Sequence, residues 1–366
     1  MKLENLYNAL EELTKTNEAF YSASQEININ GTDYIVKSYS YRLASWSDFQ
    51  LPYAKEARGT AFYSAKGSDE WHLFCRAYKK FFNLGEVIPV NEFIETHEPV
   101  ASFEKLDGSL ILFGMIEDKV IAKSKTSINS EQAQLAQSIV DNNTELRNFI
   151  VEDIIKTEHT PVFELVGPSN VIVLRYQNDD LVFLGRVDNS DCSELPVDVD
   201  ISKSLEKRGI SFAKIYKHTW GELLEIKETS KPHIEGFVVQ TNEDFVKVKV
   251  NSYISLHHLK DSVNNLKSLS ALIVSDNLDD LIGSFQDDQA TVDYIVSMQE
   301  KIGHKYNHLV ANVEDLFEKY KHLERKDFAI KTREEVADYF PLLMNKYLGK
   351  KIDYKDYFMK RKMYLD

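Results

Sequence analysis

The chain has 366 residues, enough for two domains, and its 44 Lys+Arg against 58 Asp+Glu give a formal net charge of −14 at pH 7. Because a protein that coats nucleic acid non-specifically is usually basic, this balance excludes a general coat and leaves room for an enzyme with a local basic cleft. Cys75 and Cys192 are too few for a disulfide framework or a cysteine zinc site. With no signal-peptide core and no apolar run near the roughly 20 residues that span a bilayer, we expect a soluble protein in a reducing, intracellular compartment.

From about residue 30 to residue 250, the pattern is typical of short strands broken by turns and interrupted by helices. Together these elements predict an α+β domain over residues 1–254, with antiparallel sheets and flanking helices. Segments rich in β-branched and aromatic residues predict strands at Tyr34–Tyr41, Thr60–Tyr63, Ser109–Met115, Lys119–Ser124, Pro161–Val166, Leu181–Val187, Gly236–Gln240 and Asp244–Val250. Helices are predicted at Ser130–Asp141, Thr144–Thr157, Lys203–Arg208 and Trp220–Thr229.

Beyond residue 255 turn residues become scarce and the hydrophobic period changes. Thr332 and Glu335 have the capping-box spacing that predicts the start of a helix. We therefore expect an all-α domain over residues 255–366. One apolar face of a long helix is predicted from the three-, four- and seven-residue spacings of Ile295, Met298, Ile302, Leu309, Val313, Leu316 and Tyr320.

The segment Lys105-Leu106-Asp107-Gly108-Ser109 is typical of a lysine nucleophile that attacks a phosphate. A free lysine, with a pKa of roughly 10.4, cannot attack near neutrality, but burial and neighbouring cations can lower that pKa to roughly 7–8. Asp107 could orient the amine or a metal, and Gly108 would allow the backbone to approach a nucleotide. Taken alone, the motif is more often a surface turn with a solvated lysine.

Two pairs of lysines could supply a phosphate clamp. The chain has no G-x-x-x-x-G-K-[ST] sequence, so a P-loop does not hold a nucleotide here. Lys123 with Lys125, and Lys247 with Lys249, each stand two residues apart in strand-like segments, which predicts that each pair shares one face of a sheet. Such lysines would neutralise charge at a reacting phosphate and lower the pKa of Lys105. The alternative for each pair is an edge strand with a solvated face.

Two carboxylates fall within apolar strand-like segments. Glu164 and Glu235 would be costly to bury unless they are paired or bind a metal or a ribose. A buried ion pair remains the alternative for both. Phe81 and Phe82 could form a platform for adenine, although aromatic core packing explains them equally well.

In this order along the chain, these motifs resemble the covalent nucleotidyltransferase superfamily, and most closely the T-even phage RNA ligase 1 family, ATP-dependent enzymes that seal RNA ends in tRNA repair. A helical C-terminal domain is similar to that family, whereas DNA ligases and capping enzymes typically carry an OB-fold. The resemblance covers essentially the whole length and rests on Glu56–Gly59, Lys80–Leu84, the Lys105 motif, Lys123–Lys125, Phe163–Asn170, Ile234–Val238 and Val246–Lys249.

The resemblance implies that Lys105 attacks the α-phosphorus of ATP to form Lys-AMP, that AMP passes to an RNA 5′-phosphate, and that a 3′-hydroxyl displaces it. It implies Mg²⁺, with Mn²⁺ as a substitute. The implied catalytic residues are Lys105, Glu164, Glu235, Lys247 and Lys249; the ATP-binding residues are Tyr39, Arg58, Lys80, Lys105, Lys125, Glu164, Lys247 and Lys249; the metal ligands are Glu164, Glu235, Asp279 and Asp280; Tyr253 matches a tyrosine important for activity.

Some of these implied roles have structural alternatives. Arg58 could equally be a salt-bridge partner, Asp279 and Asp280 could be a solvated acidic pair, and Tyr253 could pack where the domains meet. Thr126 after Lys125 departs from the family pattern, and the weaker similarity of the helical domain leaves its tRNA preference open.

The expected partners are single-stranded RNA ends, nicked tRNA and an upstream polynucleotide kinase/phosphatase, with no membrane, in the cytoplasm of a bacterial or phage-infected cell. The rival hypotheses are DNA-end joining, RNA capping, and a catalytically silent module that binds RNA ends. A pure binder has little use for the whole set of lysines and glutamates, which favours the enzyme.

Overall fold

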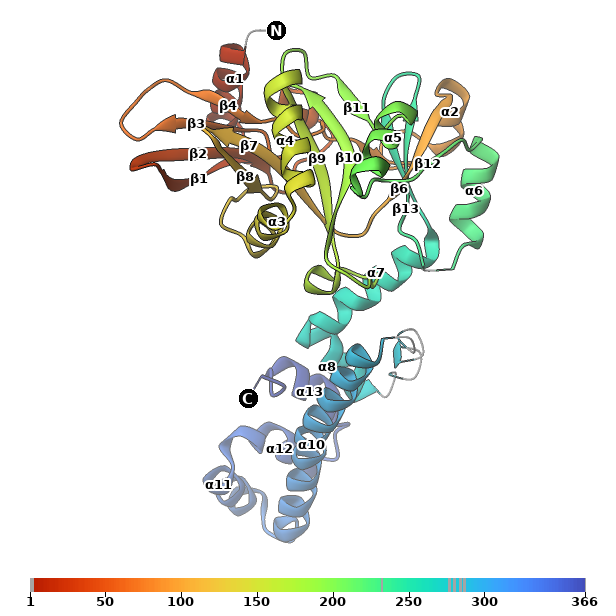
Figure 1. Ribbon diagram of the computed structural model, residues 1–366. Coiled ribbons are helices and arrows are strands. Elements are labelled where there is room, and N and C mark those ends of the chain that lie inside the picture. Colours follow the sequence, from red (N-terminus) through yellow and green to blue (C-terminus); the bar gives the residue numbers. More distant parts are fainter. Residues whose placement is uncertain are drawn as a thin grey trace. The chain divides into compact units, whose positions relative to one another are not determined.

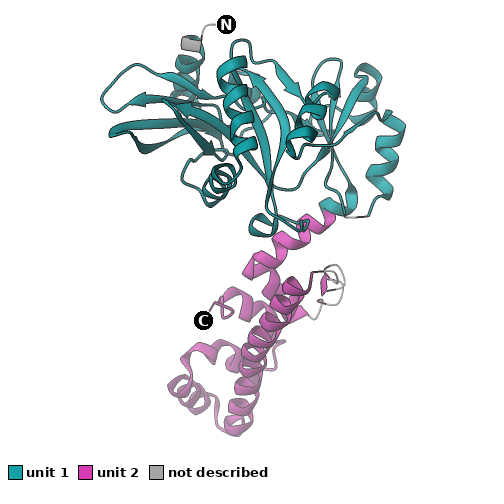
Figure 2. Ribbon diagram, in the orientation of Figure 1, with its two compact units in different colours: residues 1–254 teal, residues 255–366 magenta. Residues whose placement is uncertain are grey.

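The computed structural model describes residues 3–231, 233–275, 278, 281–282, 285 and 288–365, with only the backbone at residues 3 and 4. The chain forms two compact units, residues 1–254 and 255–366 (Figures 1 and 2). Unit 1 contains three sheets in which nearly all neighbouring strands are antiparallel, and unit 2 is helical. The expected α+β class with a helical C-terminal region is confirmed.

The first sheet, in the order β1-β2-β3-β4, begins with a tight hairpin. Its turn is Asn30-Gly31, with φ of 50° and 89°, the positive values that an Asn-Gly hairpin turn requires. The helix α1 packs on this sheet through Leu6 and Leu10, which join Tyr39 in one buried cluster. The elements are α1 (Leu3–Thr16), β1 (Phe20–Ile29), β2 (Thr32–Tyr41), β3 (Ala61–Ala65) and β4 (His72–Cys75), with short 3₁₀ turns at Asp48–Gln50 and Ala54–Glu56.

The second sheet, in the order β11-β10-β9-β7-β8, carries the largest core of unit 1. Helices α3 and α4 cover it, because their apolar side chains pack against Ile111 and Phe163 from the strands (Figure 1). Both helices were predicted and begin at an asparagine or serine N-cap. The elements are β7 (Ser109–Ile116), β8 (Lys119–Lys123), α3 (Glu131–Asp141), α4 (Thr144–Thr157), β9 (His159–Val166), β10 (Asp180–Asp188), β11 (Glu194–Pro196) and α5 (Val199–Arg208).

The third sheet has the order β12-β6-β13-β14-β5, and its β14–β5 pair is parallel. Leu223 of α6 packs on this sheet against Phe237 and Val239. Thr219 and Glu222 form a complete capping box at the start of α6. The elements are β5 (Phe82–Asn83), α2 (Val90–Thr96), β6 (Pro99–Lys105), β12 (Ile215–Tyr216), α6 (Trp220–Thr229), β13 (Gly236–Thr241) and β14 (Phe245–Lys249).

Unit 2 is organised around the long helix α10, whose predicted apolar face is confirmed: Ile295, Ile302, Leu309 and Val313 are all buried. The predicted start of a helix at Thr332 is wrong. Thr332 lies inside α11, and its buried hydroxyl donates to the carbonyl of Phe328 at 2.7 Å. No helix among the described residues is long and apolar enough to cross a bilayer. The helices are α7 (Asn251–Asn264), α8 (Leu266–Ser275), α10 (Gln289–Tyr320), α11 (Arg325–Glu335), α12 (Phe340–Tyr347) and α13 (Tyr354–Lys360).

Candidate active site

Three neighbouring strands of the third sheet bring Lys105, Glu235 and Lys249 together. Gly236, at the start of β13, pairs with Lys105 at the end of β6 on one side and with Lys249 of β14 on the other. Gly236 has φ of +142°, and an added Cβ would lie 2.1 Å from the carbonyl oxygen of Val248, so only glycine fits here. This register carries the preceding residue, Glu235, into the space between the two lysines.

The Glu235 carboxylate bridges both lysines. Lys105 Nζ donates to Glu235 Oε2 at 2.7 Å, and Lys249 Nζ lies 2.8 Å from Glu235 Oε1. The Glu235 side chain is only 4% exposed. The two lysines therefore offset the free-energy cost of burying the Glu235 carboxylate. Lys105, the predicted nucleophile, donates a hydrogen bond to Glu235, a predicted catalytic carboxylate.

A cavity of about 250 Å³ opens beside Lys105. Its walls are mostly apolar and aromatic, and a few charged groups converge on it, the composition typical of a ligand pocket. Strands of the second and third sheets both contribute to it. The lining residues are Arg58, Tyr78, Phe81, Phe103, Glu104, Lys105, Leu106, Gly108, Leu110, Glu164, Leu184, Pro196, Ala213, Val238, Phe245 and Lys247.

Two charged groups in this cavity have strongly shifted pKa values. Burial raises the pKa of Glu164 to about 7, although the positive charge of Lys105 opposes the shift. Burial, followed by the charges of Arg58 and Lys105, lowers the pKa of Lys247 to about 6. Among the described residues, the Glu164 carboxylate accepts no hydrogen bond and forms no ion pair. Shifts of this size in a cleft are typical of functional sites.

Further cations surround the cavity. The Arg58 guanidinium lies 5.2 Å and Lys247 Nζ 4.7 Å from the centre of the Phe81 ring. Lys125 Nζ lies 4.1 Å from the centre of the Tyr41 ring. Burial, and then the positive charges of Arg58 and Lys80, lower the pKa of Lys125. Since each cation weakens the protonation of the next, this cluster is suited to an anionic ligand.

Lys80 belongs to the same cluster. Burial lowers its pKa, the Arg58 charge lowers it further, and Glu86 opposes this effect. Its Nζ lies 3.7 Å from the centre of the Phe82 ring. Of the two neighbouring phenylalanines, Phe81 lines the cavity, and Phe82 packs against Phe49 instead.

Lys247 and Lys249 alternate with buried valines on β14, which confirms that they share one face of the sheet. The same expectation is wrong for Lys123 and Lys125, because β8 ends at Lys123. Lys123 is fully buried, and its Nζ donates to the carbonyl oxygens of Gly59, Ser124 and Lys125 at 2.8–3.0 Å. Its ammonium group thus fixes two loops to each other and does not face the cavity.

Asp107 does not orient the amine, contrary to the sequence-based expectation. One carboxylate oxygen accepts the backbone N–H groups of Val173 and Leu174, at 2.7 and 2.5 Å. The other accepts the hydroxyl of Tyr253 at 2.7 Å. Tyr253 is buried, and its burial, the charge of Glu235 and the hydrogen bond to Asp107 all raise its pKa. The aspartate therefore anchors the loop after β9 and the start of α7.

Gly108 lines the cavity, but the sheet itself also requires a glycine there. An added Cβ would lie 2.2 Å from the carbonyl oxygen of Leu165, a backbone atom of the neighbouring strand β9. The added Cβ would also lie 3.0 Å from Cγ of Glu164, so the glycine lets β9 and the Glu164 side chain approach the turn that follows Lys105.

Tyr39 lies outside the cavity. It is completely buried, and its hydroxyl donates to Glu11 Oε1 of α1 at 2.6 Å. Tyr41, two residues further along β2, is the tyrosine that contacts Lys125. Burial raises the pKa of Tyr41, and the charge of Arg58 opposes this shift. Sequence reasoning also missed Tyr78 and Phe245, which line the cavity. Phe245 could have been found from its position in the predicted strand with Lys247.

The predicted metal ligands Asp279 and Asp280 lie outside the described residues.

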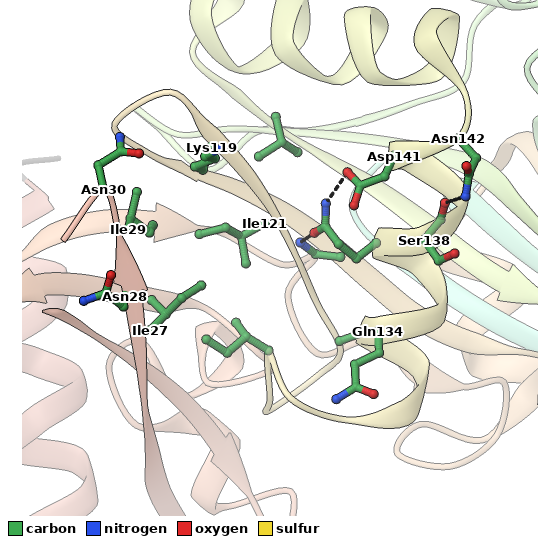
Figure 3. A pocket seen from close by; sticks show the side chains of 15 residues that line it. Ile27, Asn28, Ile29, Asn30, Lys119, Ile121, Gln134, Ser138, Asp141 and Asn142 are labelled. Atoms are coloured by element: carbon green, nitrogen blue, oxygen red, sulfur yellow. Dashed lines mark hydrogen bonds between the residues drawn. The ribbon is translucent and has the colours of Figure 1, made fainter. Parts of the chain in front are cut away.

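A larger cavity, of about 630 Å³, lies elsewhere in unit 1, between the β1–β2 hairpin, β8 and α3 (Figure 3). Its polar groups are mainly amides, and Gln137 already binds the backbone N–H of Ala122 and the carboxylate of Asp141. It contains none of the predicted site residues.

Comparison with known proteins relates both units to RNA ligases. A family model described as RNA ligase matches residues 56–254, and one described as T4 RNA ligase 1, C-terminal domain, matches residues 260–361. A candidate RNA ligase from Thermovibrio ammonificans is 24% identical over 253 residues, which make up 67% of this chain and 64% of that protein. The chain thus spans just under two thirds of the length of this curated relative.

Solved structures of RNA ligases are also similar. An archaeal ATP-dependent RNA ligase is 12% identical, with a TM-score of 0.44 over 79% of this chain and 76% of that one. A Naegleria gruberi RNA ligase variant with AMP and Mn is 11% identical, with a TM-score of 0.38 over 66% and 98% of the two chains. Since the RNA ligase model alone covers more than half of the chain, including Lys105, Glu164 and Glu235, the protein belongs to the RNA ligase family.

Proposed function

We propose that this protein is an ATP-dependent RNA ligase that joins 5′-phosphate and 3′-hydroxyl ends of single-stranded RNA. The observation that carries the proposal is the convergence on one cavity of Lys105, Glu164 and two further cations, Lys247 and Arg58. A mostly apolar pocket with these groups suits a nucleotide whose base is buried and whose phosphates meet the cations.

In the first step, the Lys105 amine attacks the α-phosphorus of ATP. A P–N bond forms, the P–O bond to pyrophosphate breaks, and pyrophosphate leaves with the bonding electron pair. The ammonium must first lose a proton, and Glu235, at 2.7 Å, is within reach to accept it. Arg58 and Lys247 would neutralise the charge that develops on the phosphates.

In the later steps AMP passes from Lys105 to the RNA 5′-phosphate, giving an RNA adenylate. The 3′-hydroxyl oxygen of the second RNA end then attacks that 5′-phosphate, and AMP leaves. Lys249, whose Nζ lies 2.8 Å from Glu235 Oε1, would neutralise charge on the phosphates once the lysyl-AMP bond has formed. In the transfer to RNA, a 5′-phosphate oxygen forms the new P–O bond, the P–N bond breaks, and the Lys105 nitrogen takes up a proton; in the last step the 3′-hydroxyl loses its proton and AMP leaves with the bonding electron pair. Negative charge builds up on phosphate oxygens in each step, so one set of cations can serve all of them.

Glu164 and Glu235 fit a divalent cation such as Mg²⁺ or Mn²⁺. Mg²⁺ is usually held by one or two carboxylates together with substrate phosphates. The Glu164 carboxyl, with its pKa raised to about 7 by burial and with no ion-pair partner among the described residues, would be stabilised by a cation beside it. A metal bound there would supply further charge neutralisation at the phosphates.

We further propose that unit 2 recognises the RNA, with nicked tRNA as the substrate. The match of residues 260–361 to the C-terminal domain of T4 RNA ligase 1 supports this assignment. We also propose that a polynucleotide kinase/phosphatase acts upstream, phosphorylating one terminus and removing phosphate from the other, so that the ends carry a 5′-phosphate and a 3′-hydroxyl.

Labelling with ATP that is radioactive at the α-phosphate tests the first step. With magnesium present, the label should survive denaturing electrophoresis in the wild type and in Lys119→Ala, which removes an exposed lysine of β8. It should be absent from Lys105→Ala. If the wild type acquires no label even with pyrophosphatase present, the ligase proposal fails, and an RNA-end-binding protein without catalysis becomes the better explanation.

A further inference from the structure

The connection between β2 and β3, residues 42–60, presents a tryptophan to solvent. Trp46 is 45% exposed, although a ring of this size is usually largely buried. Hydrogen bonds hold the loop around Trp46, at residues before and after it in the sequence. Asp48 accepts the backbone N–H and the hydroxyl of Ser45, and it also accepts the side-chain amide of Asn17, at 2.6–2.8 Å. The exposed ring is therefore presented by an ordered loop.

Beneath the ring, an aromatic contact connects this loop to the candidate active site. The ring of Trp46 packs edge-on against that of Phe82, with 5.0 Å between the centroids. Phe82 belongs to β5, which pairs with β14 so that its neighbour Asn83 is opposite Lys247. Lys80 Nζ lies 3.7 Å from the centre of the Phe82 ring, and the Lys80 charge contributes to the lowered pKa of Lys247. Trp46 and Lys80 thus contact the same phenylalanine ring, that of Phe82.

Positive charge also lies beside the exposed ring itself. Lys55 Nζ is 5.7 Å from the centre of the Trp46 ring. Lys55 and Lys80 have acidic neighbours, Asp244 at 3.9 Å and Glu86 at 3.8 Å. Both distances exceed those of hydrogen bonds. The Lys55 side chain is 34% exposed, whereas that of Lys80 is 12% exposed and its Nζ also donates to the carbonyl of Phe81 at 3.2 Å. An incoming phosphate can therefore compete with Asp244 and Glu86 for the two ammonium groups.

We propose that Trp46 stacks on a base of single-stranded RNA while Lys55 and Lys80 contact its backbone, so that this loop holds the strand whose end reacts at Lys105. The combination of an aromatic face with adjacent cations is what binds single strands: every base has a face to stack on, and every nucleotide carries a phosphate. The inference rests on the proposed ligase function for the identity of the strand, but the binding itself requires no chemistry.

The test separates RNA binding from nucleotidyl transfer. A 5′-phosphorylated oligoadenylate with a fluorophore at its 3′ end would be titrated with the full-length protein without ATP, and fluorescence anisotropy would give the dissociation constant. Trp46→Ala should weaken binding roughly tenfold to a hundredfold, the usual effect of removing a stacked ring. Trp46→Phe, which keeps an aromatic face, should recover most of the affinity. Ile155→Ala, at a 60% exposed apolar residue of α4, should bind as the wild type does.

Formation of lysyl-AMP from ATP alone should be equal in all four proteins, because that step needs no RNA. Equal RNA affinity of Trp46→Ala and the wild type would overturn the proposal. Contact with another protein would then be the better explanation of the exposed ring. Loss of lysyl-AMP in Trp46→Ala would also overturn it, since the ring would then serve the ATP site or the fold. If the wild type forms no lysyl-AMP, the proposed function fails, while the affinity comparison still decides whether this loop binds RNA.

Discussion

Lys247 should take up a proton when a nucleoside triphosphate binds. Burial, followed by the charges of Arg58 and Lys105, lowers the pKa of Lys247 to about 6, so about nine in ten of these amines are neutral at pH 7. Phosphate oxygens beside the amine favour its charged form and should return the pKa toward its usual value of roughly 10.4. Lys247 should therefore gain about 0.9 proton for each nucleotide bound at pH 7.

Glu164 opposes this uptake near neutrality. Because burial raises its pKa to about 7, the carboxyl is about half protonated at pH 7, and a cation bound beside it would release about 0.5 proton. The net uptake should then be about 0.4 proton at pH 7. At pH 8, where Glu164 is already mostly ionised and Lys247 almost wholly neutral, the net uptake should rise to about 0.9 proton.

Isothermal titration calorimetry measures this proton transfer directly. The protein would be titrated with α,β-methylene-ATP, which cannot adenylate Lys105, in buffers of different ionisation enthalpy at pH 7 and pH 8. Lys247→Met should lose the uptake, and Lys119→Met, at an exposed lysine of β8, should keep it. The reasoning is refuted if the wild type takes up no proton at pH 8, or if Lys247→Met takes up as much as the wild type.

Three further predictions concern stability. Since burial raises the pKa of Glu164 to about 7, the folded protein keeps a proton that the unfolded chain releases. The free energy of unfolding should therefore fall by up to ~3 kcal/mol as pH rises from about 4.5 to about 7. Urea titrations should show a smaller fall in Glu164→Gln. Lys123→Met removes the ammonium that donates to three carbonyl oxygens, and it should cost about 1–3 kcal/mol by urea titration, against less than about 0.5 for Lys119→Met. An equal effect of the two would contradict the anchoring role. Gly108→Ala, whose Cβ would lie 2.2 Å from the carbonyl oxygen of Leu165, should lower the melting temperature in scanning fluorimetry, and an unchanged value would show that the strands can separate at no cost.

Local patterns predicted the fold class because most strands and helices of this chain carry their own signals. The alternation of Lys247 and Lys249 with buried valines marked both a strand and its polar face. Sustained apolar spacing marked α10. Where the pattern was short it failed: the two-residue spacing of Lys123 and Lys125 continues past the end of β8. The spacing of Thr332 and Glu335 also occurs within helices, so it could not by itself mark a start.

The geometry of the site depended on contacts that no local pattern contains. Asp107 finds its partner Tyr253 146 residues further along the chain, so its anchoring role was not readable from the motif around Lys105. The exposure of Trp46 likewise depends on how the loop after β2 is fixed by Asn17. By contrast, a buried ion pair was an open alternative for Glu235, since a carboxylate in an apolar strand needs a cation, although the sequence did not indicate that Lys105 and Lys249 are its partners.

The alignment of Gly236 with both Lys105 and Lys249 makes the spacing of the candidate catalytic groups a property of the sheet's hydrogen-bond ladder. A slip of one residue in either pairing would turn every side chain of that strand to the opposite face and separate the nucleophile from its carboxylate. A misfolded sheet is therefore also an inactive one. If Lys105 forms lysyl-AMP as proposed, the yield of lysyl-AMP during refolding should report when β6, β13 and β14 have reached their correct alignment.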